Sequence, residues 1–259
     1  MRLQTLFSTE GNIWKIYFDQ YSKTLLVETR FDGEKSSAFS ALKPLDGNLL
    51  WQELQLDENL WTGVAAFNHG KLGIHIYDEE KSYPLPRDLV VMDVATGDFS
   101  WNKEHVQLLD FTTDTAIVQD LNEDNKHLFL DVQSGTELTN KTTIPSQKSD
   151  SPILNPIEYV QENEHFQTFE KFLEKKFNHV PFKSIEYLET EKNLILSYYI
   201  KSGKILQQFL LVLTREGNVL YHEIIGKSEK GVGLDTFMIY ENVLLFTKDQ
   251  NQLISIDLN

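Results

Sequence analysis

The 259-residue sequence contains no cysteine. This absence excludes disulfides, thiolate nucleophiles, iron–sulfur clusters and zinc sites built on cysteine. No stretch approaches the roughly 18 apolar residues of a membrane-spanning helix, and residues 1–10 lack the continuous apolar core of a signal peptide. We therefore expect no membrane span and a cytoplasmic location.

Basic residues are also few. The sequence has 24 Lys and Arg against 39 Asp and Glu, which gives a formal net charge of -15. Such a chain would repel a phosphate backbone and an anionic membrane surface. The composition predicts neither nucleic acid nor a membrane as a partner, and it leaves a protein partner, a cationic ligand or a neutral ligand.

The motifs of several common enzyme classes are missing. The sequence has no Gly-x-Ser-x-Gly, no His-Glu-x-x-His and no Gly-x-Gly-x-x-Gly before a helix. The seven histidines are scattered without zinc spacing, and ordinary hydrogen-bonded or surface roles explain them best. We expect no catalytic residue and no cofactor from these patterns.

The sequence does contain a repeated hairpin, in which an apolar strand is followed by a polar turn ending in glycine and by a strand carrying an aromatic residue. Two copies are clear, at residues 41–51 and 91–101, and two are weaker, at 128–138 and 211–221. Glycine closes such a turn because it adopts positive φ without steric cost. The structural positions of the repeat are Gly47, Trp51, Gly97, Trp101, Gly135 and Gly217. A four-stranded unit that recurs about every 40 to 50 residues is typical of a β-propeller.

Alternation of apolar and polar residues predicts four strands in each of four units. These units span residues 13–54, 61–105, 108–143 and 184–225. A fifth unit, 236–257, has three strands, and an orphan strand at 2–7 precedes the first unit. Pairing of the two terminal strands would complete the fifth sheet and remove an open edge. We predict an all-β propeller of five four-stranded blades in a single domain over 1–259, with six blades as the alternative if the segment around the helix hides a further unit.

The periodicity changes between the third and fourth units. The apolar residues at helical spacing there are Val160, Phe166, Phe169, Leu173 and Phe177. Pro156 suits a helix start, and Lys175 and Lys176 suit a helix end. We predict one helix over about 157–177, inserted within about 150–180. Its apolar side favours packing on its own propeller, and the alternative is a partner-binding face or a lid.

The turn followed by two apolar residues and Trp resembles the repeat of the quinoprotein-type (PQQ-like) β-propeller superfamily. The resemblance covers most of the chain as architecture and implies that Trp51 and Trp101 are wedged between neighbouring blades. The resemblance does not extend to the cofactor. The quinone-dependent dehydrogenases of this type have larger rings of about eight blades, with calcium ligands and, in many members, adjacent cysteines, and this chain does not show that pattern. The overall pattern also resembles a small cytoplasmic family of unknown function from bacteria of the Bacteroides group, which implies no known chemistry.

One segment has oxygen-bearing residues at alternate positions, as calcium loops do: Asp120, Asn122 and Asp124. Asp131 stands at the twelfth position. The sixth position is Asn125 instead of glycine, and no bidentate glutamate follows. These residues are therefore weak metal candidates, and an ordinary polar hairpin turn is the favoured interpretation.

The leading functional hypothesis is a non-catalytic cytoplasmic β-propeller that acts as a binding or scaffold module for a protein or small ligand at the propeller face. The alternative is a carbohydrate-active hydrolase or lyase with carboxylates in the central channel, since glycoside hydrolysis requires a pair of them. Asp19, Asp110 and Asp235 stand at strand starts and are candidates, although turn chemistry explains them more simply. Convergent carboxylates with perturbed pKa values would favour the enzyme.

Overall fold

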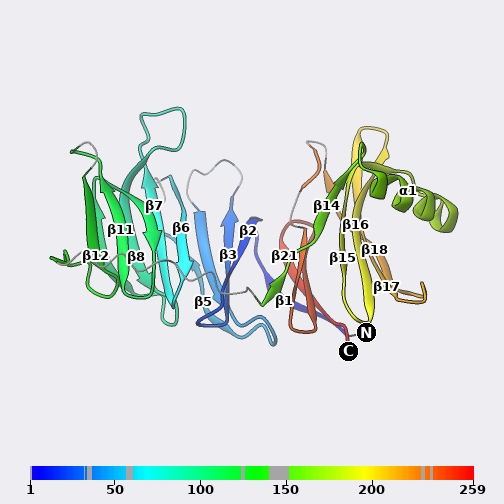
Figure 1. Ribbon diagram of the computed structural model, residues 1–259, viewed down its shortest axis with the longest axis horizontal. Coiled ribbons are helices and arrows are strands. Elements are labelled where there is room, and N and C mark those ends of the chain that lie inside the picture. The colour runs from blue at the N-terminus through cyan, green and yellow to red at the C-terminus, as the bar shows by residue number, and fades with distance from the viewer. Residues whose placement is uncertain are drawn as a thin grey trace. The chain divides into compact units, whose positions relative to one another are not determined.

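The computed structural model describes residues 2–31, 33, 37–56, 61–123, 126–139, 152–228, 231–233 and 236–259. The chain divides into two compact units. The N-terminal unit is Thr9–Ser151, and the C-terminal unit combines Met1–Ser8 with Pro152–Asn259. In the described residues the strands form five antiparallel sheets (Figure 1).

The N-terminal unit contains three sheets, in each of which every strand pairs with its neighbour in sequence. The first sheet consists of β2 (Asn12–Asp19), β3 (Thr24–Arg30), β4 (Ser37–Leu42) and β5 (Leu49–Leu54). The second consists of β6 (Thr62–Asn68), β7 (Lys71–Tyr77), β8 (Pro86–Asp93) and β9 (Phe99–Glu104). The third consists of β10 (Val106–Phe111), β11 (Thr115–Asp120) and β12 (His127–Asp131). A fourth strand was expected in this last sheet, where Glu137 forms an isolated bridge to Leu130 and residues 140–142 lie outside the described residues.

The C-terminal unit contains two five-stranded sheets. One consists, in spatial order, of β14 (Ile157–Val160), β15 (Pro181–Glu189), β16 (Asn193–Ser202), β17 (Ile205–Thr214) and β18 (Val219–Ser228). The other consists of β1 (Leu3–Ser8), β21 (Gln252–Asp257), β20 (Val243–Lys248), β19 (Phe237–Tyr240) and β13 (Ile153–Leu154). The expected pairing of the terminal strands is confirmed, with Leu3 opposite Ile256. The all-β organisation in five sheets is confirmed as well, while their closure into one ring stays a prediction.

The helix α1 spans Glu164–Phe177, so the predicted start near residue 157 is wrong. Residues 157–160 form β14 instead, because their backbone pairs with residues 184–187 of β15. Asn163 then caps the helix by accepting a hydrogen bond from the backbone N–H of His165 at 2.8 Å. Val160, which fits the helical spacing, is therefore a strand residue. Because β13 and β14 extend the sheets beside them, the described residues form five sheets and no sixth.

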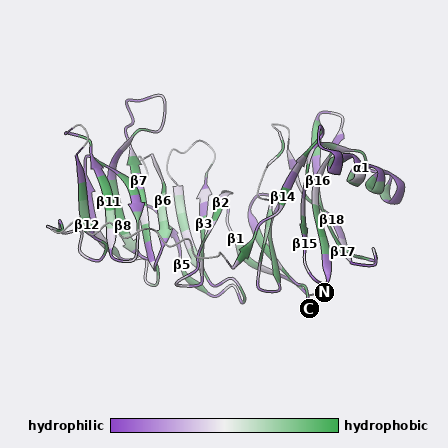
Figure 2. Ribbon diagram, in the orientation of Figure 1, coloured by the Kyte–Doolittle hydropathy of each residue, from purple (hydrophilic) through white to green (hydrophobic). Residues whose placement is uncertain are grey.

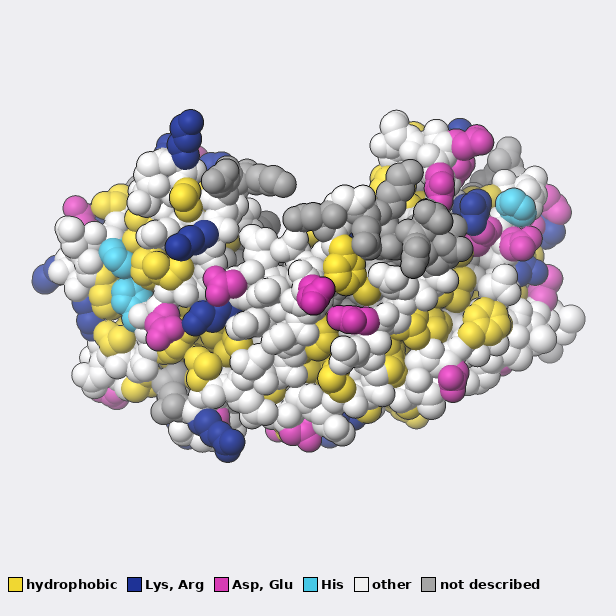
Figure 3. Space-filling view, turned by 180° about the vertical axis from the view of Figure 1, so that it is seen from behind, with side chains coloured by type: hydrophobic (Ala, Val, Ile, Leu, Met, Phe, Trp, Pro, Cys, Tyr) yellow, Lys and Arg dark blue, Asp and Glu magenta, His cyan; other side chains and the backbone are white. Residues whose placement is uncertain are grey.

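The surface shows no large apolar face on the side drawn in Figure 3, where hydrophobic side chains are interspersed with charged ones of both signs. In the described part of the chain, no helix has the length and apolar character that a membrane span requires.

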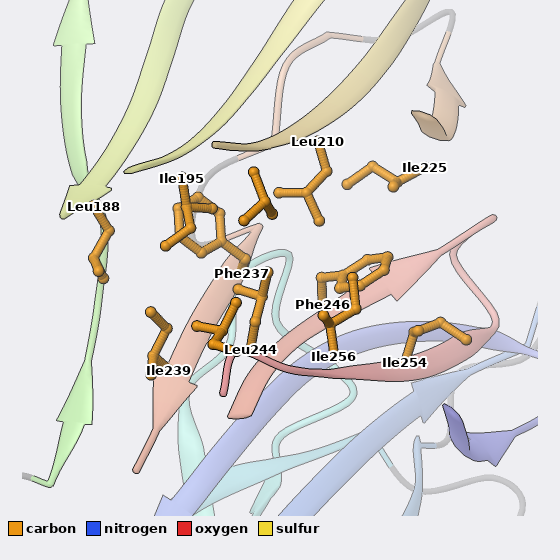
Figure 4. Close-up of a cluster of buried hydrophobic side chains, with 12 residues drawn as sticks. Leu188, Ile195, Leu210, Ile225, Phe237, Ile239, Leu244, Phe246, Ile254 and Ile256 are labelled. Carbon is orange, nitrogen blue, oxygen red and sulfur yellow. The ribbon is translucent and has the colours of Figure 1, made fainter. Parts of the chain in front are cut away.

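The core of the C-terminal unit lies between its two sheets. Side chains of β15 to β18, such as Ile195 and Leu210, point toward Phe237 and Phe246 of the other sheet (Figure 4). All four are 1% exposed or less. Burial of such a side chain stabilises the fold by about 1.5 to 3 kcal/mol, so this interface holds the unit together.

The helix covers the other face of the β14–β18 sheet. Figure 2 shows both hydrophobic and hydrophilic residues along α1. Phe166 and Leu173 are buried against Ile185, Leu196 and Tyr198 of the sheet. The interpretation in which the apolar stripe packs on the protein's own sheet is therefore confirmed.

Candidate functional site

Four of the repeat residues lie at contacts between consecutive sheets of the N-terminal unit: Trp51, Gly97, Trp101 and Gly135. The indole Nε1 of Trp51, on β5, donates a hydrogen bond of 2.8 Å to the carbonyl of Val94, in the turn after β8. Gly97 closes that turn with φ of 76°, and a Cβ at this position would lie 3.0 Å from the Trp51 ring. Glycine is thus required both by the backbone conformation and by the close approach of the indole.

The same arrangement recurs one sheet later. The Nε1 of Trp101, on β9, donates a hydrogen bond of 2.8 Å to the carbonyl of Val132, and a Cβ at Gly135 would lie 2.6 Å from the Trp101 ring. Gly47 and Gly217 also have positive φ, but the space beside Gly217 is open. Trp51 and Trp101, with Gly97 and Gly135, therefore hold consecutive sheets together.

The carboxylates of Asp120 and Asp131, two of the candidate calcium ligands, bind groups of their own turns. A carboxylate oxygen of Asp120 accepts the backbone N–H of Asn122 at 2.9 Å, and the other lies 3.5 Å from the amino group of Lys126. The hydrogen bond from Asn122 is the main reason that the pKa of Asp120 is lowered. Asp131 binds the backbone of its own turn in the same way, and Asp124 lies outside the described residues. No group of three or more potential metal-ligating side chains occurs among the residues that the structure describes.

Two of the carboxylates considered for the enzyme alternative, Asp19 and Asp110, lie in the described part of the chain, and each binds backbone N–H groups. Asp19 is 1% exposed and accepts backbone N–H groups from Tyr21 at 3.0 Å and from Gly70, in the next sheet, at 2.7 Å. Asp110 accepts the backbone N–H of Phe111. Asp235 lies outside the described residues. Asp19 therefore joins two sheets, and Asp110 binds local backbone.

A groove is present in the C-terminal unit, formed by two adjoining cavities of about 570 and about 450 Å³. The larger is lined mainly by charged and polar residues of hairpin turns, and the smaller mainly by apolar residues of β13 to β15. Leu154 and Glu189 line both cavities, which makes the groove continuous. We call it the Glu189 groove.

A hydrogen-bonded trio fixes the charges in the middle of the groove. The guanidinium of Arg215 lies 2.7 Å from one carboxylate oxygen of Glu189, and the hydroxyl of Tyr187 donates to the other at 2.5 Å. The hydrogen bond from Tyr187, followed by that from Arg215, lowers the pKa of Glu189. Burial, followed by the neighbouring carboxylate, raises the pKa of Tyr187 to about 12. Both pKa values lie further from neutral pH than the ordinary values of a glutamate and a tyrosine. An efficient general acid or base, in contrast, has a pKa near the working pH.

The two ends of the groove differ in chemistry. The polar end adds Glu191, Lys192 and Glu241 to the ion pair, so three carboxylates face two cations. At the apolar end Leu154 and Ile157 are 48% and 60% exposed. An arrangement of this kind can bind a molecule with one charged and one apolar part.

None of the groove residues is identified by the sequence patterns. The polar ones belong to ordinary turns of separate hairpins, and the apolar ones lie on β13 and β14, in a segment expected to be loop and helix. The available signal is an apolar run interrupted by prolines, Pro152-Ile-Leu-Asn-Pro156-Ile157, which does not fit helical spacing.

One family model matches part of the N-terminal unit. Residues 18–101 match a family model described as a domain of unknown function (DUF4905). The match runs from the end of β2 into β9 and does not include the groove. No curated protein matches the chain.

Two solved structures show distant similarity. An oligogalacturonate lyase in complex with manganese has 12% sequence identity and a TM-score of 0.33, over 98% of this chain and 79% of the lyase chain. AztD of Citrobacter koseri has 12% identity and a TM-score of 0.27, over 93% of this chain and 74% of that chain. TM-scores below 0.5 do not establish a common fold.

Proposed function

We propose that this protein is a non-catalytic cytoplasmic binding module that holds a small, positively charged amphiphilic ligand in the Glu189 groove. The observation that carries the proposal is the continuity of an apolar and a charged cavity through Leu154 and Glu189. Both volumes fall within the roughly 300 to 1,000 Å³ of typical ligand pockets.

The sign of the ligand charge follows from the groove and from the chain. Glu189 already pairs with Arg215, so the cation of Arg215 is largely neutralised. Glu191 and Glu241 then face Lys192 at the same end, which leaves a negative excess. The net charge of -15 favours the approach of a cation over that of an anion.

The fixed charges support binding over catalysis. The pKa of Glu189 is lowered and that of Tyr187 is raised to about 12, so neither group exchanges protons readily near neutral pH. A ligand would meet a stable carboxylate and a neutral phenol, which suits recognition.

The test uses three probes of equal length and different charge: hexylamine, hexanol and hexanoate. Amide resonances of the full chain are followed by NMR as each probe is added. We expect hexylamine to shift resonances of residues 153–157, 187–193 and 241–242 at the lowest concentration, because it combines an apolar chain with a cation. Hexanol should follow, and hexanoate should bind most weakly.

A matched pair of variants assigns the charge preference. Glu241→Gln removes a groove carboxylate and should weaken hexylamine binding by about twofold to fivefold, the range of a partly exposed ion pair. Glu104→Gln makes the same change at an exposed position on β9 of the other unit and should leave the affinity unchanged. Tightest binding by hexanoate, or an absence of shifts in the groove with all three probes, would overturn the proposal.

A further inference from the structure

Two histidines and a tyrosine meet where the end of α1 lies on its sheet. The hydroxyl of Tyr198, on β16, lies 3.0 Å from Nδ1 of His179 and 2.7 Å from Nε2 of His222, on β18. The side chain of Tyr198 is fully buried, and both histidines are half-buried. Neither the repeat nor the Glu189 groove involves these three residues.

Aromatic rings surround the cluster. The ring of Phe177, the last residue of α1, lies 4.2 Å from the ring of His222, and Phe209 of β17 stacks on Tyr198 at 5.6 Å with an angle of 11°. His179 lies 4.7 Å from Phe209. The histidines therefore lie in a largely apolar setting, where a charge is costly.

The last turn of α1 is tied directly to this cluster. Asn178 caps the helix in the left-handed conformation, and its N–H bonds to the carbonyl of Glu174 at 2.9 Å. The N–H of His179 bonds to the carbonyl of Leu173 at 3.3 Å. The imidazole of His179 consequently moves with the end of the helix, while Tyr198 and His222 belong to the sheet.

The hydrogen-bond arithmetic requires at least one of the two histidines to be neutral. A tyrosine hydroxyl has one hydrogen, so it donates to one of the two facing nitrogens and accepts an N–H from the other. If both imidazoles were protonated, both nitrogens would donate to the same oxygen and the hydroxyl hydrogen would lose its acceptor. Two cationic rings would also stand 5.4 Å apart between centroids.

The other groups that face the cluster add no negative charge. From α1, the amino group of Lys176 lies 5.9 Å from the Phe177 ring. From β17 comes the uncharged ring of Phe209, and from β16 the phenol of Tyr198, whose pKa is raised by burial. On β18 the neighbour Glu223 pairs with Lys248. Protonation of both rings would therefore place two like charges side by side in a partly buried setting.

We propose that His179, Tyr198 and His222 form a pH-sensitive latch, which holds the C-terminal end of α1 on its sheet and opens when both imidazoles become protonated. Above the titration range the three groups satisfy each other. Below that range one hydrogen bond is lost and the two cationic imidazoles repel each other. The side chain of His179 then moves away from the sheet together with the last turn of the helix.

A competing effect is the helix dipole, which favours a cation near a helix C-terminus. Burial outweighs it, because the pKa of His179 is lowered by burial, and that of His222 is lowered by burial and then by the charge of His179. The latch is therefore closed at neutral pH and responds below the ordinary histidine range.

The test is hydrogen–deuterium exchange of the full chain at a series of pH values from about 7 to about 5, corrected for intrinsic exchange rates. In the wild type, protection of residues 170–180 should fall by about tenfold or more across this range, because opening is linked to the uptake of two protons. Protection of β20 and β21, in the other sheet of the same unit, should change much less.

Three variants identify the groups responsible. His179→Gln and His222→Gln each remove one titrating ring and keep a neutral hydrogen-bonding group, so each should reduce the pH dependence at residues 170–180. His165→Gln, on the exposed side of the same helix, is the matched control and should keep the full pH dependence. The proposal is overturned if wild-type protection at 170–180 does not depend on pH, or if all three variants respond as the wild type does.

Discussion

The two units of the protein differ in the contacts that join their sheets. In the N-terminal unit, consecutive sheets are joined by the same device twice, an indole that bonds to a turn carbonyl and rests on a glycine. In the C-terminal unit the position equivalent to the indole is Tyr221, which packs on Phe246, and the space beside Gly217 is open. The unit that lacks the indole contact has the longer strands, the helix, the groove and the histidine latch.

This contrast indicates how a repeat accommodates function. Where a close indole fixes the distance between sheets, little room is left for a cavity. In the C-terminal unit the apolar layer of Phe237 and Phe246 joins the sheets without an indole contact, and the groove lies at the turns and inserted strands of this unit. The experiments below test this difference, in order of decreasing expected effect.

The largest effect is expected from the pair Gly135→Ala and Gly217→Ala. Both glycines have positive φ, which costs alanine about 1 to 2 kcal/mol. At Gly135 the added Cβ would also lie 2.6 Å from the Trp101 ring, so the total cost should be about 3 kcal/mol. Urea unfolding of both variants measures the difference, and equal destabilisation would show that the indole contact is unimportant.

A second pair compares Trp101→Phe with Tyr221→Phe. Loss of the indole N–H leaves the carbonyl of Val132 without its 2.8 Å partner in a buried position, which should cost about 2 kcal/mol. The hydroxyl of Tyr221 makes an exposed contact of 3.4 Å with Glu223, so its removal should cost less than about 0.5 kcal/mol. Thermal unfolding of the two variants checks the contrast, and similar midpoints would contradict it.

The third prediction concerns the pH dependence of stability. Burial lowers the pKa of His75, whose Nε2 accepts the backbone N–H of Leu108 in the next sheet, and the pKa values of His179 and His222 are lowered as well. Because the folded-state values lie below the unfolded value of about 6.5, stability is fully present above that pH and is lost as the pH falls toward the folded-state values.

Each histidine contributes a slope of at most about 1.4 kcal/mol per pH unit, and the two in the C-terminal unit contribute less because they are partly exposed. Urea unfolding between about pH 8 and about pH 5 measures the profile. His75→Gln should flatten the part that belongs to the N-terminal unit. An increase in wild-type stability on acidification through this range would reverse the sign and refute the assignment.

The smallest effect is expected at the turn that follows β11. Asp120→Asn keeps an oxygen that can accept the N–H of Asn122 and loses an ion pair to the exposed Lys126, so stability should change very little. Millimolar calcium should leave the unfolding midpoint of both proteins unchanged. A calcium-dependent rise that Asp120→Asn abolishes would restore the metal interpretation.

The strands of the repeat can be predicted from the sequence because their signals are local. Gly97 and Gly135 mark turns through the backbone conformation that they alone adopt cheaply, and the flanking alternation sets the strand faces. The start of α1 could not be predicted in this way. Pro156 and Val160 fit a helix equally well, and pairing of residues 157–160 with β15 decides against it.

The groove and the latch depend on long-range contacts. Glu189 ends β15, and Arg215 and Glu241 lie in the turns of two other hairpins. His179 and His222 are isolated histidines in sequence, and the fold brings both of them to the hydroxyl of Tyr198. Neither the spacing of residues nor the composition predicts these contacts, because they join residues that are far apart in the sequence and become neighbours only in the folded sheets.

The pairing of β1 with β21 has a consequence for biosynthesis. Every sheet of the N-terminal unit uses strands that are consecutive in sequence, so each hairpin can form as soon as it leaves the ribosome. Leu3 is translated long before its partner Ile256. The strand β1 must therefore wait without its partner until β21 has been synthesised, and the long loop between them can close only after that.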